Sequence, residues 1–248
     1  MKMISANMMS KNELPMRRSG AFTLVELLIV ISIIGVLAGF IVAALGPIKK
    51  LKAVNTAKAE LAQIQTALEA YKGKYGVYPP SNENTNSLYT PLNDRAQFNQ
   101  LFYELSGTTQ GKVNGVDSFI TLDGAYSIPV TDVTTAYKVG GFINCSKGSG
   151  EDAVPAKNFL LSLSTKQVAD LVTNNAIHTT VLVTAVGGPD DNYRPFGQLA
   201  ININPVRYLY PGVNNPLSYD LWVQLVVSGK TNLVCNWTKN VQVNTSYP

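Results

Sequence analysis

A run of 22 residues without a charged side chain, residues 27–48, constrains this chain more than any other feature. About 20 apolar residues, at a rise of 1.5 Å per residue in an α-helix, span the hydrocarbon core of a bilayer. A buried helix of a soluble domain would instead need a core that surrounds the whole run on every side. The run therefore predicts one transmembrane helix over residues 27–48.

The helical pattern continues beyond the apolar run. Apolar residues recur at spacings of three and four, with polar side chains between them, at Leu51, Val54, Ala57, Leu61, Ile64, Leu68, Tyr71 and Tyr75. This pattern is typical of an amphipathic helix, whose apolar face needs a partner. Proline lacks a backbone donor, so Gly46-Pro47 should bend or loosen the helix locally. We expect one helix from Phe22 to about Lys72, within a segment 22–76 that the glycines and prolines of 73–80 terminate.

The segment before this helix, residues 1–21, is a basic leader without periodicity. Its charged residues are Lys2, Lys11, Arg17 and Arg18 against Glu13. In an ordinary secretory signal the cleavage site follows the apolar region, whereas here the small residues Gly20 and Ala21 precede it. Cleavage at this junction would remove the leader and keep the helix.

The positive charges of the leader also predict the orientation of the chain. The positive-inside rule places the leader in the cytoplasm and residues 77–248 on the exported side. Lys49, Lys50 and Lys52, which follow the apolar run, weaken this charge contrast.

Residues 77–248 are numerous enough to form a core of their own. We expect helices at 94–105, with Asp94 as N-cap, and at 164–173, opened by a Ser164/Gln167 capping box. Expected strands are 137–143, 159–163, 181–183, 199–203, 221–227 and 233–237, the last two joined as a hairpin. The predicted fold class is α+β, with a small antiparallel sheet packed on the amphipathic half of the long helix.

Few side chains point to catalysis or nucleic-acid binding. The single histidine, His178, has no serine or cysteine motif beside it, so we expect a surface or structural histidine. Residues 22–248 carry 16 basic and 15 acidic side chains, which is no footprint for nucleic acid.

Two pairs of residues leave alternatives open. Asp190 and Asp191, in a glycine-rich stretch, could bind a hard cation such as calcium or could simply form a turn. Cys145 and Cys235 lie on the expected exported side, where a disulfide can persist. Their number permits either a bridge or two buried free thiols.

The segment 19–39 closely resembles the N-terminus of type IV prepilins and of type II secretion pseudopilins, including Phe-Thr-Leu-Val-Glu at 22–26. Tyr-Gly-Val-Tyr-Pro at 75–79, and Tyr-Asp-Leu-Trp at 219–222 followed by Cys-Asn-Trp at 235–237, resemble the major pseudopilins. The resemblance is strong over residues 20–80, whereas residues 98–196 have no counterpart in it.

The resemblance implies that a prepilin peptidase cuts the leader and methylates the new N-terminal amine. Phe22 would become the mature N-terminus and Glu26 the fifth residue. The family prefers glycine directly before the phenylalanine, but Ala21 stands here, so a cut after Gly20 remains an alternative to a cut after Ala21. Glu26 would pair with the α-amine of an adjacent subunit, or would merely occupy a wet helix end.

The resemblance implies a non-enzymatic type IV pilin-like subunit that polymerises into a type II secretion pseudopilus. Its expected location is the inner membrane, as a single-pass protein with a cytoplasmic N-terminus. Expected partners are prepilin peptidase, other subunits, the inner-membrane assembly platform with its ATPase, and membrane lipid. The alternatives are a type IV pilus subunit for adhesion or DNA uptake and a membrane-anchored periplasmic binding or hydrolytic domain. No cofactor is expected, since residues 223–235 lack the acidic residues of the family's calcium loop.

Overall fold

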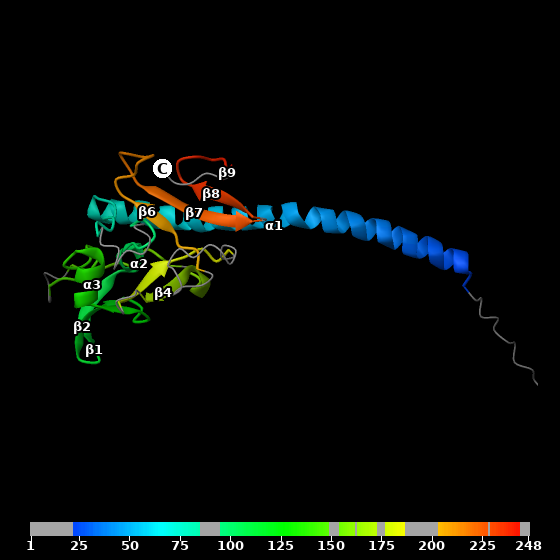
Figure 1. The fold of residues 1–248 in the computed structure, drawn as a ribbon. Coiled ribbons are helices and arrows are strands. Elements are labelled where there is room, and N and C mark those ends of the chain that lie inside the picture. Colours follow the sequence, from blue (N-terminus) through cyan, green and yellow to red (C-terminus); the bar gives the residue numbers. More distant parts are fainter. Residues whose placement is uncertain are drawn as a thin grey trace, which may run out of the picture. The chain divides into compact units, whose positions relative to one another are not determined.

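The computed structural model describes residues 22–84, 95–148, 154–161, 163–172, 177–186, 203–227 and 229–243. The chain divides into two compact units, Met1–Leu45 and Gly46–Pro248. A long N-terminal helix precedes small antiparallel sheets and short helices in the second unit (Figure 1). The predicted α+β, pilin-like fold class is confirmed.

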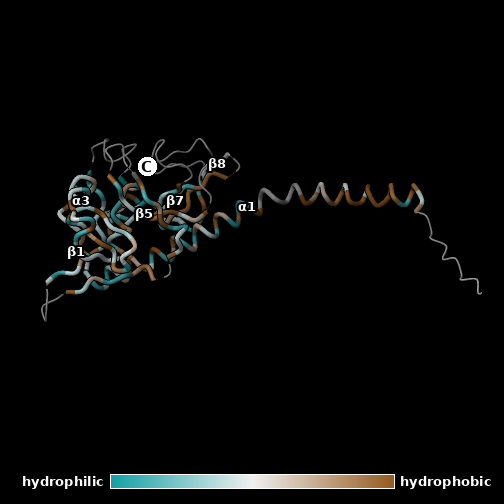
Figure 2. Tube along the Cα trace, turned by 90° about the horizontal axis from the view of Figure 1, so that it is seen from below, coloured by the Kyte–Doolittle hydropathy of each residue, from teal (hydrophilic) through white to brown (hydrophobic). Residues whose placement is uncertain are grey.

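Helix α1 comprises Leu24–Tyr75, 52 residues, and continues through Gly46-Pro47. In the first unit its most apolar stretch is Leu24–Ile41, with a mean hydropathy of 2.8 and no buried residue. Figure 2 shows this stretch as an almost unbroken hydrophobic run. By length and composition it is able to cross a membrane, and it overlaps residues 27–41 of the predicted run 27–48.

In the second unit, α1 buries one face against the rest of the chain. The buried residues are Val54, Ala57, Leu61, Ile64, Ala67, Leu68 and Tyr71, which confirms the predicted stripe except at its two ends, since Tyr75 is only half-buried. Leu51 is 62% exposed, so its side chain lies outside the core. The helix ends at Tyr75. The N–H of the following Gly76 donates to the carbonyl of Lys72 over 2.8 Å, and its φ of 77° suits a residue without a Cβ.

The C-terminal sheet has the order β6-β7-β8-β9, with β6 at Arg207–Leu209, β7 at Asp220–Val227, β8 at Lys230–Cys235 and β9 at Gln242–Val243. All of its pairings are antiparallel, so the predicted hairpin of β7 and β8 is confirmed. Leu221, Val223 and Leu225 belong to the same core cluster as the buried face of α1. Trp222 and Leu233 form a separate small cluster with Ala96. The sheet therefore packs on α1 through alternate residues of β7.

The middle of the chain builds two further sheets. One contains β1 at Thr108–Val113, β2 at Val116–Thr121 and β3 at Ser127–Pro129, and the other pairs β4 at Val168–Val172 with β5 at His178–Leu182. Of the two short helices, α3 at Val130–Tyr137 packs on the first sheet, whereas α2 at Leu101–Ser106 packs against β5 of the second. This part has no counterpart in the sequence resemblance, yet it shares one hydrophobic core with α1.

Several local predictions are wrong. The helix expected from Asp94 begins only at Leu101, and Asp94 itself lies outside the described residues. Residues 137–143 form no strand, because Tyr137 ends α3 and Lys138 adopts a left-handed φ of 56°. Residues 159–161 and 163 are also outside any strand. These apolar runs fill the core from loops: Leu160 and Phe142 are buried there.

The Ser164/Gln167 capping box is present, but it opens only the single 3₁₀ turn η3, Thr165–Gln167. Residues 168–172 then form β4 instead of the expected helix, because they pair with β5. Of the strand expected at 199–203, residues 199–202 lie outside the described residues and Ile203 is in no strand.

The hairpin of β1 and β2 was not predicted, although its turn has a clear sequence signal. Asn114 and Gly115 join the two strands with φ values of 50° and 83°. A two-residue turn of this type requires positive φ at both positions, which Asn-Gly adopts most readily.

A buried carboxylate connects α1 to the middle of the chain. Glu104 of α2 is fully buried, and its Oε2 accepts hydrogen bonds from the Tyr71 hydroxyl at 2.9 Å and the Asn144 N–H at 3.0 Å. Its Oε1 accepts the Ile143 N–H at 2.9 Å. Burial raises the pKa of Glu104 and outweighs the opposite effect of these donors.

This buried carboxyl predicts a pH dependence of stability. Since the folded state raises the pKa of Glu104 above its ordinary 4.5, its contribution to stability is full below pH 4.5 and is lost as the pH rises through the folded pKa. Relative to Glu104→Gln, a neutral mimic, the wild type should lose up to about 1.4 kcal/mol per pH unit in that window. Chemical denaturation followed by tryptophan fluorescence measures this difference. The exposed Glu83→Gln should show no such trend, and a flat difference for Glu104→Gln would refute the expectation.

Candidate functional site

The start of α1 is organised by two side chains, Thr23 and Glu26. The Thr23 hydroxyl oxygen accepts the Glu26 N–H at 3.2 Å, and Glu26 Oε2 accepts the Thr23 N–H at 2.9 Å. The Thr23 hydroxyl also donates to the same Oε2 at 2.8 Å. These contacts form a capping box, which satisfies backbone donors that the first helical turn leaves without partners.

The capping box gives Glu26 a role within one chain. The sequence predicts that Glu26 pairs with an amine of another subunit or occupies a wet helix end. The structure places its side chain at the exposed N-terminus of α1, where the helix dipole favours a negative charge. The signal for the cap, threonine followed three residues later by glutamate, is present in the sequence.

The expected processing residues adjoin this cap. Phe22 directly precedes Thr23 and is 77% exposed. Gly20 and Ala21 lie outside the described residues. The cap thus begins one residue after the expected mature N-terminus.

The two pseudopilin-like stretches near the C-terminus meet in space. Trp222 of β7 faces Cys235 of β8, and the rings of Trp222 and Trp237 are 5.8 Å apart at 70°. Asn236 fixes this contact, because its Oδ1 accepts the Leu221 N–H at 3.0 Å and its Nδ2 donates to the Tyr219 carbonyl at 2.9 Å.

The pseudopilin-like stretches 75–79 and 219–222 both contact the end of α1. The Tyr78 hydroxyl donates to Glu69 Oε1 at 2.9 Å, and the Tyr219 hydroxyl lies 3.5 Å from the same oxygen. The rings of Tyr78 and Tyr219 are 4.8 Å apart. These sequence stretches therefore serve to anchor the sheet on α1.

Asp220, next to Tyr219, holds a tight loop rather than facing an open site. Its carboxylate accepts the backbone N–H groups of Asn214 at 2.8 Å and Asn215 at 3.0 Å. A Cβ on Gly212 would come within 2.6 Å of Asp220 Oδ1, so the loop requires glycine there.

The remaining candidate residues do not converge. Cys145 is a buried free thiol, and Cys235 is a half-buried free thiol. Burial raises the pKa of the Cys235 thiol.

His178 is exposed at the start of β5, as predicted. Asp190 and Asp191 lie outside the described residues, and within the described ranges no three His, Cys, Asp or Glu side chains group as metal ligands.

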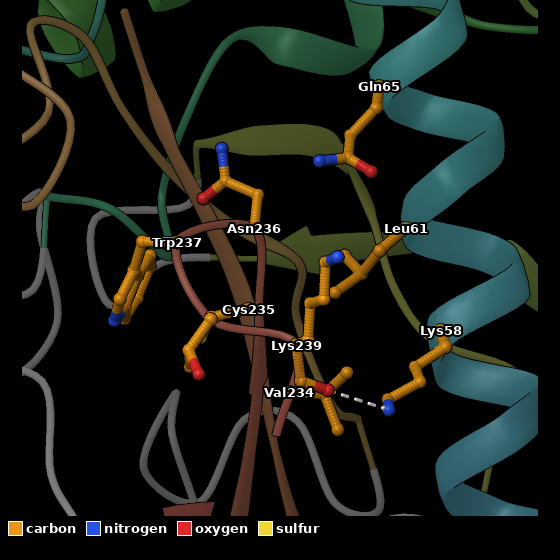
Figure 3. A pocket seen from close by; sticks show the side chains of 9 residues that line it. Lys58, Leu61, Gln65, Val234, Cys235, Asn236, Trp237 and Lys239 are labelled. Carbon is orange, nitrogen blue, oxygen red and sulfur yellow. Dashed lines mark hydrogen bonds between the residues drawn. The ribbon is translucent and has the colours of Figure 1, made fainter. Parts of the chain in front are cut away.

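A surface cavity of about 520 Å³ lies between α1 and the end of β8. Figure 3 shows Lys58, Leu61 and Gln65 of α1 on one side. Residues 234–239 form the other side, and the Lys58 ammonium donates to the Lys239 carbonyl at 3.0 Å. The cavity is lined by amide, lysine, hydroxyl, thiol and apolar side chains, without an acidic residue.

Comparison with known proteins bears on the N-terminal junction. Residues 16–42 match the family model described as the prokaryotic N-terminal methylation motif. Over 75 residues the chain is 33% identical to the type II secretion system core protein G of Vibrio cholerae serotype O1, covering 30% of this chain. The match covers 51% of that relative, about half its length. No solved structure matches the chain. The predicted resemblance to prepilins and pseudopilins is confirmed.

The capping box can be tested separately from any assembly. Thr23→Val removes the hydroxyl that accepts the Glu26 N–H, so the first turn of α1 should lose about 1 kcal/mol of stability. Hydrogen exchange of the amides at 24–28, with the full chain in detergent micelles, should therefore become faster. Thr23→Ser keeps the hydroxyl and should exchange like the wild type; equal exchange in the valine variant would contradict the assignment.

Proposed function

We propose that this chain, which carries the prepilin-type methylation motif, is a structural subunit of a type II secretion pseudopilus. The observation that carries the proposal is the motif at residues 16–42, followed by the exposed apolar helix Leu24–Ile41. A helix satisfies its own backbone hydrogen bonds, so the same segment is suited both to a bilayer and to the apolar core of a helical bundle.

The first step of the proposal is processing. Prepilin peptidase cuts on the cytoplasmic face, between Ala21 and Phe22, and the new amine is methylated. Before the cut, the subunit is a single-pass inner-membrane protein with a cytoplasmic leader and a periplasmic second unit. Cutting leaves Thr23 and Glu26 in place to cap α1.

The second step is assembly, in which Glu26 acts between subunits. Its Oε2 holds Thr23, whereas its Oε1 accepts no hydrogen bond from the described part of the chain. The free oxygen is therefore available to the α-amine of an adjacent subunit. An unpaired charged group in apolar surroundings costs several kcal/mol, so a subunit would be most stable where its amine meets Glu26 of its neighbour. This pairing would set the axial register of adjacent subunits. Other subunits, the inner-membrane platform and its ATPase are the partners of this step.

The similarity to a secretion core protein favours a secretion filament over the second candidate, a type IV pilus for adhesion or DNA uptake. The middle of the chain supports neither choice, since it has no counterpart in the resemblance. The family that the motif identifies consists of structural subunits, so we propose no enzymatic activity.

Sequencing of the mature N-terminus tests the processing step. Co-expression of the full chain with a prepilin peptidase should yield N-methylated Phe22 as the first residue, detected by mass spectrometry. An Ala21 start would move Glu26 one place from the amine and would overturn the proposed register. An uncut chain would overturn the proposed function.

Glu26→Gln separates the two roles of this side chain. The amide oxygen still accepts from Thr23, so the helix start should remain intact in the hydrogen-exchange measurement. The lost charge removes the amine pairing, and filament formation, followed by electron microscopy, should fall to background. Glu83→Gln, an exposed glutamate of the second unit, should assemble normally. Unchanged assembly of Glu26→Gln would sink the pairing hypothesis.

A further inference from the structure

Positive charge is concentrated on two segments of the second unit. The lysines concerned are Lys49, Lys50, Lys52 and Lys58 of α1, with Lys230 and Lys239 near the C-terminus. Neither residues 27–59 nor residues 221–248 contain an aspartate or a glutamate. The remainder of residues 22–248 carries ten basic and fifteen acidic side chains, so the charges are segregated along the chain.

The two lysine-bearing segments lie against each other. The Lys58 ammonium donates to the Lys239 carbonyl at 3.0 Å, and Leu61 and Val234 line the same cavity (Figure 3). These contacts connect the middle of α1 to the segment that follows β8.

Lys230 reaches the same end of the unit. Tyr219, just before β7, lies 3.5 Å from Glu69, and β7 then runs along α1 for eight residues (Figure 1). Eight residues of strand cover about 26 Å, the length of about 17 residues of helix. Val223 of β7 pairs with Val234, which lines the same cavity as Leu61 of α1. From Tyr219 near Glu69, β7 therefore runs past the level of Leu61, toward the N-terminal end of this part of α1. The hairpin turn and Lys230 therefore lie near the level of Lys52.

The part of α1 that carries these lysines is both basic and apolar. Ile48 is 60% exposed and Leu51 62% exposed, and they alternate with Lys49, Lys50 and Lys52. Exposed aliphatic side chains between lysines are typical of segments at the level of lipid headgroups, where the lysine ammonium reaches phosphate. Lys49 also follows the charge-free run 27–48 directly in the sequence.

We propose that these six lysines form a surface that binds the phosphates of anionic phospholipid headgroups. The inference rests on the membrane anchor of the proposed function, but not on processing or polymerisation. It also explains why Lys49, Lys50 and Lys52 follow the anchor, where they weaken the charge contrast across it. Each lysine close to an anionic leaflet strengthens binding by about fivefold.

The test uses the full chain, one molecule per lipid nanodisc, in phosphatidylcholine or in an equal mixture with phosphatidylglycerol. Hydrogen exchange of the amides at 48–58 and 229–240 should be slower with phosphatidylglycerol, and high salt should remove the difference. Inorganic phosphate at matched ionic strength should not compete, since a single free anion does not bridge several lysines.

Three variants complete the test, and the two glutamine variants lose the same number of charges. Lys52→Gln/Lys230→Gln/Lys239→Gln should lose the phosphatidylglycerol effect, and the corresponding triple arginine variant should keep it. Lys112→Gln/Lys138→Gln/Lys166→Gln removes three exposed lysines elsewhere and should behave like the wild type.

Three outcomes would overturn the proposal. Equal exchange in both lipids would exclude an anionic headgroup surface, and full competition by phosphate would indicate a free-anion site. Protection that appears only when two molecules share a disc would assign the surface to a second copy. Failure of the chain to insert into either disc would count against the membrane anchor itself and so against the proposed function.

Discussion

The contact between the apolar stripe of α1 and the remainder of the second unit is the interaction on which that unit depends. The stripe runs from Val54 to Tyr71, and it meets β7 on one side and α2 with its neighbouring loops on the other. Each buried aliphatic or aromatic side chain contributes roughly 1.5–3 kcal/mol relative to exposure, so this shared core ties the separate small sheets to one helix. The two-stranded sheet of β4 and β5 in particular is too small to be stable by itself.

Polar contacts decide how the parts fit onto that stripe. Exposed Glu69 accepts hydrogen bonds from the hydroxyls of Tyr78 and Tyr219, while buried Glu104 accepts them from the hydroxyl of Tyr71 and two backbone donors in the middle of the chain. Buried polar groups are costly without partners, so the contacts of Glu104 select one arrangement among many that would bury the same apolar area. The middle region is thus integrated into the core, not merely attached to it.

Charged side chains lie at both ends of the apolar run. One carboxylate, Glu26, lies at the start of the apolar helix and caps it. Lysines follow the run on α1, and further lysines lie on the neighbouring C-terminal segment. An apolar helix bounded by polar groups at both ends has a defined depth in a bilayer. The capping residues are compatible with a later role in contacts between subunits, because Glu26 keeps one carboxylate oxygen without a partner among the described residues.

By itself, the sequence determined the long helix, its apolar and amphipathic halves, the junction before it and the hairpin of β7 and β8, because periodicity and turn residues act locally. Only the tertiary structure decided the middle of the chain, where residues 168–172 became a strand and residues 137–143 a helix end and a loop. Short apolar runs are compatible with helix, strand or loop, and the tertiary contacts that bury them determine which one forms. The same holds for the lysine surface, since Lys58 and Lys239 are far apart in sequence and meet only because β8 packs beside α1.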